Sequence, residues 1–141
     1  MSLEENKIIV RKAIEAVNKQ DLSLLDDLVV PNYFDNTVKQ GLEWYKQSLA
    51  ILYKGFPDYH GAIEDIVAEG NKVWARVTYE GTHSGEYLGF APTGKKVSYK
   101  SVTIKRIADG KIVEGWTVND MLDFLRQLGV IEYKGFPDEA T

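Results

Sequence analysis

The 141-residue sequence contains no cysteine and only two histidines. Without cysteine the chain can form no disulfide, no thiolate metal site and no cysteine nucleophile. The two histidines have no carboxylates at a suitable spacing, so the sequence does not indicate a metal site. The lack of cysteine also suits a reducing compartment, and we expect a cytoplasmic protein.

Long apolar runs and an excess of basic residues are also absent. The first ten residues, MSLEENKIIV, are too polar for a signal peptide, and no stretch is apolar enough to span a membrane. The net charge of −4 opposes general nucleic-acid binding, which needs a basic surface. We therefore expect neither a membrane nor a nucleic acid as partner.

The length of 141 residues fits a single domain over residues 1–141, since no linker or low-complexity segment divides the chain. The tail, residues 130–141, matches no regular element, and we expect it to be loosely ordered. Eight Tyr, three Trp and five Phe provide enough aromatic side chains to line a pocket.

Apolar residues recur at helical spacing through the first part of the chain and near its end. This periodicity predicts helices over residues 5–21, 22–30, 41–56 and 120–129. Ser2 and Glu5 form a capping box before the first helix, Asp21 caps the second, and Pro31 ends it. The stretch NYFDNTVKQ, residues 32–40, is polar and aromatic and has no predicted element.

The period then changes from helical to alternating, which is typical of strands. Four strands are predicted, over residues 60–69, 71–82, 95–107 and 111–119. Gly70-Asn71 and Asp109-Gly110 are turn signals for two hairpins. Helices that precede such a meander predict an α+β fold, in which they cover one face of an antiparallel four-stranded sheet.

The hairpin around Asp109-Gly110 predicts a register for the last two strands. A two-residue loop places Lys105 opposite Glu114, Thr103 opposite Trp116 and Tyr99 opposite Asp120. The last strand then carries Glu114, Trp116 and Asp120 on one face. A β-bulge would change this register.

Two carboxylates on a largely apolar strand face allow two interpretations each. Glu114 can form an ordinary cross-strand ion pair with Lys105, with Arg76 as a second candidate partner, or it can contact a ligand. Asp120 can cap the last helix, or it can lie at the rim of an apolar pocket, where desolvation would raise its pKa and make it a better base.

The segments GTHSGEYLGFAPTGKKV, RIADGKIVEGWTVND and QLG, at 81–97, 106–120 and 127–129, follow FPD at 56–58. In this order and spacing they resemble the SnoaL-like polyketide cyclases, within the larger group that has the nuclear transport factor 2-like fold. The resemblance implies a cone-shaped α+β barrel, whose strongly curved sheet wraps around the helices and leaves a pocket between them.

The family's characterised cyclases close a ring by an aldol reaction, with one aspartate as acid and base and no metal or organic cofactor. The position that matches this aspartate is Asp120, in the pattern that includes Glu114 and Trp116. The resemblance thus implies a cofactor-independent cyclase or isomerase that acts on a small, mostly apolar or aromatic carbonyl compound. It also implies a homodimer, since this fold often pairs through the outer face of its sheet.

Three further side chains are candidates for the site. His83 either hydrogen-bonds the glycine-rich loop that follows it or acts as a second acid near Asp120. Tyr99 could bind a developing enolate oxygen, as a tyrosine does in ketosteroid isomerase, which would also suit a double-bond isomerase. Trp44 either lines the pocket or lies on the surface.

No amide or histidine is found on the predicted face beside Trp116, where a cyclase would bind the enolate oxygen. A non-catalytic module that binds a small molecule or forms a dimer is therefore the alternative to an enzyme.

Overall fold

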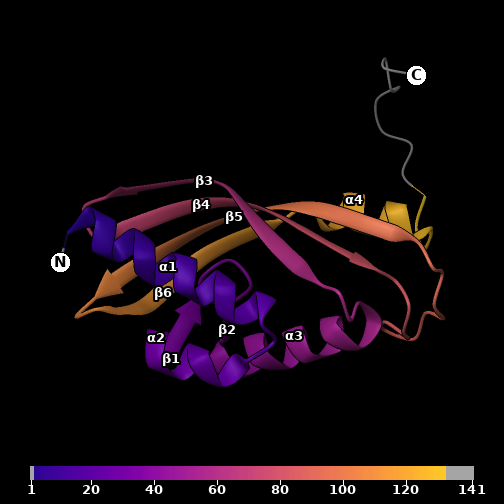
Figure 1. Ribbon diagram of the computed structural model, residues 1–141, viewed down its shortest axis with the longest axis horizontal. Coiled ribbons are helices and arrows are strands. Elements are labelled where there is room, and N and C mark those ends of the chain that lie inside the picture. Colours follow the sequence, from indigo (N-terminus) through magenta and orange to yellow (C-terminus); the bar gives the residue numbers. More distant parts are fainter. Residues whose placement is uncertain (1, 133–141) are drawn as a thin grey trace, which may run out of the picture.

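The computed structural model describes residues 2–132, which form a curved mixed sheet with helices on its inner side (Figure 1). The helices are α1 (Leu3–Asn18), α2 (Leu25–Leu28), α3 (Leu42–Gly55) and α4 (Met121–Leu128), with a 3₁₀ turn at Leu22–Leu24. The strands are β1 (Val29–Asp35), β2 (Gln40–Gly41), β3 (His60–Glu69), β4 (Lys72–Thr82), β5 (Lys96–Ala108) and β6 (Lys111–Asn119). Residues 133–141 of the predicted tail lie outside the described part.

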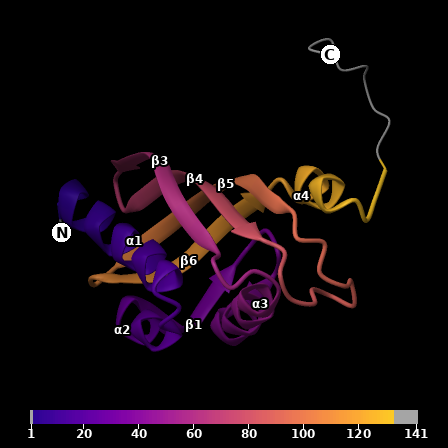
Figure 2. The same ribbon diagram turned by 45° about the vertical axis from the view of Figure 1, so that its right-hand side comes forward.

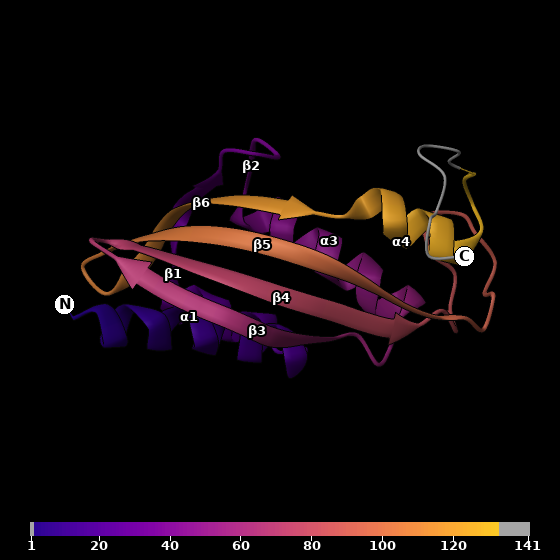
Figure 3. The same cartoon turned by 90° about the horizontal axis from the view of Figure 1, so that it is seen from above.

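The six strands lie in the order β2-β1-β6-β5-β4-β3. Strand β1 runs parallel to β6, and every other neighbouring pair is antiparallel. Figure 3 shows β3, β4, β5 and β6 side by side, with α1 and α3 behind them and α4 beyond the end of β6. The rotated view in Figure 2 shows α1, α2 and α3 on the same side of the sheet. This arrangement confirms the predicted α+β cone.

The four strands and two hairpins predicted from alternation are confirmed, with Gly70, Asp109 and Gly110 at positive φ in the turns. The capping box is also confirmed, because Ser2 Oγ accepts from the Glu5 amide and Glu5 Oε1 accepts from the Ser2 amide.

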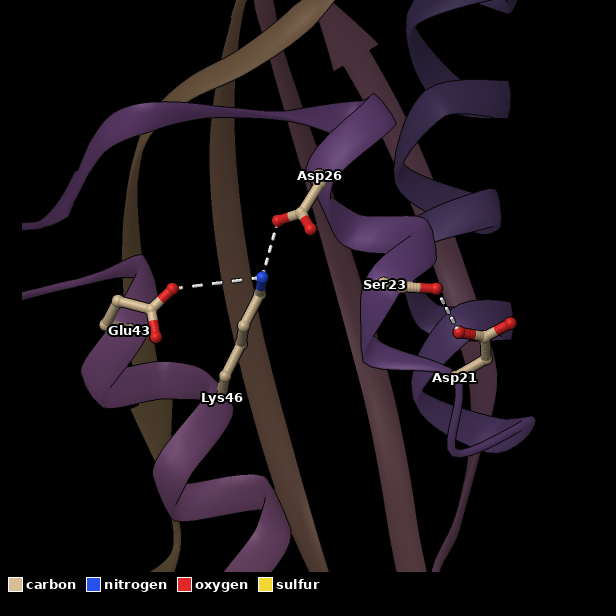
Figure 4. A network of polar contacts seen from close by, with 5 residues as sticks. All are labelled: Asp21, Ser23, Asp26, Glu43 and Lys46. Carbon is tan, nitrogen blue, oxygen red and sulfur yellow. Dashed lines mark hydrogen bonds and ion pairs between the residues drawn. The ribbon is translucent and has the colours of Figure 1, made fainter.

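The sheet has two more strands than predicted. The predicted helix over 22–30 ends before Val29, where the β-branched pair Val29-Val30 begins β1. Pro31 therefore lies inside a strand. The β1–β6 pairing is irregular between Val29 and Phe34, so the backbone N–H that proline lacks is not needed for a ladder hydrogen bond at Pro31. Asp21 makes no side-chain bond to a helix amide, and its carboxylate accepts from the Ser23 hydroxyl at 2.5 Å instead (Figure 4).

A β-bulge at Val113 makes the predicted register wrong beyond the turn. Ile107 pairs with Ile112 as expected, but Arg106 pairs with Glu114, so Val113 has no partner of its own. Each later residue of β6 is thereby displaced to the opposite face. Trp116 pairs with Ile104 rather than with Thr103.

The bulge separates two chemically different faces. Inner positions carry Gly115, Thr117 and Asn119, of which Thr117 and Asn119 line a cavity. Outer positions belong to a patch of apolar side chains that spans four strands, β3 to β6: Val67, Trp74, Val102, Ile104, Trp116 and Val118. Trp74 is 48% exposed and Val118 64% exposed. The homodimer stays a prediction. In such a dimer, this patch is the apolar surface on the outer face of the sheet against which a second copy would pack.

Polar side chains connect the helices to each other and to the sheet. Lys46 on α3 lies 2.5 Å from Asp26 on α2 and 3.9 Å from Glu43, and so bridges the two helices (Figure 4). At the end of α1, the Asn18 side chain both donates to the Gly61 carbonyl at 2.9 Å and accepts from its amide at 2.7 Å. Within residues 2–132, no helix combines the length and apolar composition needed to cross a bilayer.

Two adjacent leucines provide a test of this packing. Leu25 is 1% exposed and belongs to the core between the helices and the sheet, whereas Leu24 is 37% exposed. We expect Leu25→Ala to lower the free energy of unfolding by about 2–4 kcal/mol, because it removes buried methyl groups and leaves a cavity. Leu24→Ala should change it by less than about 1 kcal/mol. Urea unfolding followed by circular dichroism measures both, and equal losses would contradict the packing described.

Candidate functional site

A cavity of about 490 Å³ lies between the helices and the inner face of the sheet. Its volume is in the range of small-molecule sites. Aliphatic side chains from α1, α2, α3 and β6 form much of its wall, among them Val10, Ile14, Leu25, Leu49 and Ile112. Six tyrosines also line it: Tyr33, Tyr45, Tyr59, Tyr79, Tyr87 and Tyr99. The site is therefore mostly apolar and can enclose flat, apolar molecules.

Strand β5 contributes a row of inward side chains that becomes more polar toward the β5–β6 turn. Tyr99, Ser101, Thr103 and Lys105 all line the cavity, and they span about 20 Å along the strand. Thr103 shares a hydrogen bond of 2.9 Å with Thr117 on β6. Hydroxyl groups thus lead from the tyrosine end of the cavity to Lys105.

The polar end of the cavity consists of Tyr33, Asp35 and Lys105, which we call the polar cluster. Lys105 Nζ donates to Tyr33 Oη at 2.6 Å and lies 4.9 Å from the centroid of its ring. Tyr33 Oη lies 3.5 Å from Asp35 Oδ2. Asp35 Oδ1 accepts from the amides of Thr37 and Val38 at 2.9 and 3.2 Å. The carboxylate is fixed by its own turn and is 6% exposed.

Gly115 leaves the space in which the polar cluster forms. A Cβ at this position would come within 2.5 Å of Tyr33 Oη and within 3.0 Å of Lys105 Nζ. The bulge places Gly115, rather than Glu114 or Trp116, opposite Lys105. Because of this register and the missing side chain at Gly115, Tyr33 on β1 and Lys105 on β5 can contact each other across β6.

Burial dominates the electrostatics of the polar cluster. It lowers the pKa of Lys105 from 10.5 to about 8, an effect that the negative charge of Asp35 partly opposes. Burial, with Asp35 nearby, also raises the pKa of Tyr33 well above its ordinary value. Near neutral pH the Tyr33 hydroxyl is thus a hydrogen-bond donor, and Lys105 has an accessible neutral form.

Tyrosines form the opposite part of the wall. Tyr59 and Tyr99 share a hydrogen bond of 2.5 Å between their hydroxyls, and Tyr79 stacks on both rings at 5.2 and 5.5 Å. Burial raises the pKa of Tyr99 to about 12. The predicted pairing of Tyr99 with Asp120 is wrong, since Tyr99 faces Tyr79 on β4 and lies outside the β5–β6 ladder.

The rim of the cavity is apolar and exposed. Trp44 on α3 lines the cavity and is 43% exposed, so the two alternatives for this residue are combined at the rim. Tyr45, the next residue on α3, lines the cavity as well. Val38, Ile51, Leu88 and Met121 complete the exposed apolar rim.

Asp120 does not lie in a dry pocket. It is exposed, and its Oδ1 accepts from the Asp123 amide at 3.1 Å, which makes it the N-cap of α4. Its neighbours Asn119 and Met121 line the cavity, whereas Asp120 does not. The expectation of a desolvated carboxylate is wrong for this structure, because the bulge displaces the end of β6 and the chain turns into α4 at this residue.

Trp116 and Glu114 also lie outside the cavity lining, on the outer face of the sheet. Lys72 Nζ is 5.4 Å from the Trp116 ring. Glu114 pairs with Arg106 Nε at 2.5 Å, and Asn36 Nδ2 donates to it at 3.1 Å. These hydrogen bonds hold its pKa below the ordinary value. The prediction that Glu114 pairs with Lys105 or Arg76 is wrong, because the bulge shifts the β5–β6 pairing by one residue.

His83 is fully buried at the base of the 83–94 loop and does not line the cavity. Its ring stacks on Phe56 at 5.2 Å, and its Nδ1 accepts from the Thr93 amide at 3.2 Å. This is the loop-bonding alternative for His83.

The sequence alone does not point to Tyr33 and Asp35 as site residues, and it suggests an ion pair for Lys105. The alternation in VVPNYFD indicates a strand, because Val29, Tyr33 and Asp35 are separated by even numbers of residues and would share one face. Pro31 obscures this strand pattern, because a proline inside a segment normally argues against a strand there.

A sequence profile of the SnoaL-like polyketide cyclase family matches residues 7–128. The chain belongs to this family. A named relative, the aklanonic acid methyl ester cyclase AcmA of Streptomyces galilaeus, is 29% identical over 134 residues, which cover 90% of this chain and 92% of that protein. The nogalonic acid methyl ester cyclase of Streptomyces nogalater is 26% identical over 122 residues, covering 82% and 91%.

Solved structures agree with the fold. AclR of Streptomyces galilaeus, provisionally described as a hydroxylase, has a TM-score of 0.86 and 31% identity, covering 94% of this chain and 86% of its own. TsrD of Streptomyces laurentii has a TM-score of 0.82 and 26% identity, covering 93% and 99%. Because a cyclase and a protein described as a hydroxylase both resemble this chain, the fold alone does not fix the reaction.

The pKa of Lys105 predicts a pH dependence of stability. Between pH 8 and 10.5 the unfolded chain holds a proton on Lys105 that the folded chain has released, so the free energy of unfolding gains a term that rises with pH. Lys105→Met removes this term. We therefore compare the free energy of unfolding of the variant with that of the wild type at each pH. Their difference, variant minus wild type, should become more negative by roughly 1–3 kcal/mol between pH 7 and pH 10.5. Urea unfolding at several pH values measures it.

The matched control is Lys100→Met, which removes one charge from the exposed outer face of the same strand. Subtracting its profile corrects for the change in net charge. Identical profiles for the two variants would show that Lys105 is not held in a desolvated environment.

Proposed function

We propose that the chain is a cofactor-independent enzyme that binds a small, mostly apolar carbonyl compound in the 490 Å³ cavity and catalyses a cyclase-type proton transfer on it. The observation that carries this proposal is the cavity itself, whose mostly apolar wall ends in the polar cluster. An apolar wall holds a flat carbon skeleton and excludes water, while a few polar groups orient it. Membership of the cyclase family supports the reaction type.

The polar cluster provides the groups that such a reaction needs. The Tyr33 hydroxyl can donate to a carbonyl oxygen and stabilise the enolate that forms when the neighbouring carbon loses a proton. Asp35 supplies a carboxylate beside this hydroxyl, with its Oδ2 at 3.5 Å. Because the two amides bind Oδ1, Oδ2 is the oxygen placed to accept a proton from the substrate.

The family resemblance instead assigns the proton transfer to Asp120. The geometry supports Asp35 over it, since Asp35 lines the cavity and is buried, whereas Asp120 is exposed and engaged as a helix cap. Asp120 stays a candidate from the resemblance alone, and Trp116, Glu114 and His83 have no contact with the cavity that would give them a role in binding.

A binding module without catalysis is the second candidate. It is favoured by the wall near the tyrosines, where Tyr59 and Tyr99 satisfy each other by a hydrogen bond and offer a flat apolar surface. Binding of a probe without conversion would select this alternative.

Filling the cavity should abolish binding. Ser48 on α3 lines the cavity, whereas Ala50, two residues on, is exposed and does not. We expect Ser48→Trp to weaken binding of aklanonic acid methyl ester at least about tenfold, because the indole occupies ligand space, and Ala50→Trp to preserve it. Quenching of intrinsic fluorescence measures binding, and turnover is followed by chromatography. Equal affinity in both variants would place the ligand elsewhere.

The two carboxylates can be separated by paired substitutions. Asp35→Asn keeps the Oδ1 acceptor for the Thr37 and Val38 amides but removes the base, and Asp120→Asn likewise keeps the cap oxygen. We expect Asp35→Asn to lower kcat for a substrate that the wild type converts, by about 10²-fold or more, and Asp120→Asn to lower it much less. Unfolding curves check that both variants are folded. The reverse order would return the role to Asp120.

A further inference from the structure

Lys105 lines a mostly apolar cavity, and its amine is the chemically reactive group there. Within residues 2–132 its Nζ has no ion pair; it donates to the Tyr33 hydroxyl at 2.6 Å and lies 4.9 Å from the centroid of the Tyr33 ring. No other lysine among those residues lines the cavity. A lysine held in this way is poorly stabilised as a cation and is available to a ligand.

The surroundings of Lys105 position the amine rather than merely bury it. The Tyr33 hydroxyl fixes Nζ from β1, and the bare backbone of Gly115 on β6 leaves the space beside it. Among residues 2–132, Asp35 is the only carboxylate that lines the cavity with it, and its Oδ1 already accepts from two amides of its own turn. The amine therefore faces ligand space with a hydroxyl beside it.

The reactivity of an amine toward a carbonyl depends on its neutral form. Burial lowers the pKa of Lys105 to about 8, so a useful fraction is neutral near physiological pH. Enzymes activate lysines for carbonyl chemistry in this way, by desolvation in an apolar pocket. The geometry and the electrostatics thus favour the same chemistry.

We propose that Lys105 forms a reversible imine with the carbonyl group of a ketone or 1,3-diketone bound in the cavity. This inference rests on the proposed function, since it assumes that a carbonyl compound enters the same cavity. It assigns a covalent role to a side chain that neither the family match nor the resemblance assigns to the reaction.

The step balances without an oxidant or cofactor. The Lys105 ammonium gives up one proton, and the neutral amine adds to the carbonyl carbon to form a carbinolamine. The carbinolamine hydroxyl takes up a proton and leaves as water, so ammonium and ketone become protonated imine and water. Tyr33 Oη, at 2.6 Å from Nζ, is placed to relay that proton. The protonated imine withdraws electrons and makes the adjacent C–H more acidic, which assists loss of the proton to a base.

Reductive trapping tests the proposal directly. The full chain is incubated with 1-phenylbutane-1,3-dione as probe, treated with sodium cyanoborohydride at pH 7.5, digested and mapped by mass spectrometry. We expect the reduced adduct on Lys105 to form at least about tenfold faster than on Lys100, an exposed lysine of the same strand. The other lysines serve as internal controls. Labelling of Lys105 no faster than that of Lys100 overturns the proposal.

Variants separate this inference from the proposed function. Lys105→Arg keeps a cation but cannot form an imine, so we expect it to bind the probe by fluorescence quenching and to lose the rapid adduct. If the wild type binds the probe and gives no rapid adduct, the inference fails while the proposed function stands. If Ser48→Trp leaves both binding and labelling unchanged, the cavity is not the ligand site and both fail. Site mapping on the wild type decides the inference even if Lys105→Arg is unstable.

Discussion

The extra residue at Val113 is the constraint on which the chemistry of the inner face depends. It turns Glu114, Trp116 and Val118 outward and brings Gly115, Thr117 and Asn119 inward. Without it, a tryptophan and a carboxylate would occupy the cavity at the place where Lys105 and Tyr33 now meet. The bulge therefore decides which half of an alternating strand contacts a ligand, although every residue of the strand is the same in either register.

The second determinant is the contrast between the polar cluster and the surfaces around it. Tyr33, Asp35 and Lys105 satisfy part of one another's polarity in a cavity whose wall is mostly hydrocarbon and ring. Removing water from such a group strengthens its electrostatic interactions and shifts its protonation equilibria. The outer-face pair of Arg106 and Glu114 has the same kinds of charge but is partly solvated, and it is suited to holding strands together.

Sequence patterns predicted the elements well and the site poorly, for a physical reason. Alternation and the turn signals located all four long strands, because burial on one face imposes a period of two. The same alternation cannot reveal a bulge, which leaves composition and period unchanged on either side. Tyr33 and Asp35 were missed because their strand pairs in parallel with β6, a contact distant in sequence, and contains Pro31. The family resemblance predicted the cone but placed its aspartate at a position that is exposed here.

The buried ring of His83 has a consequence for ligand exchange. The ring accepts from the Thr93 amide, and the backbone of the same residue donates to the Lys95 carbonyl and accepts from the Gly94 amide, so both ends of the 83–94 loop are held together. The amides of Ser84 and Gly85 bind the Gly55 carbonyl at the end of α3. Only the tip, with Tyr87 and Leu88 at the cavity, lies beyond these anchors. Movement of this loop at the opening is thereby limited to its tip, so substitution of Leu88 would alter ligand entry while the base of the loop stays bonded to the end of α3.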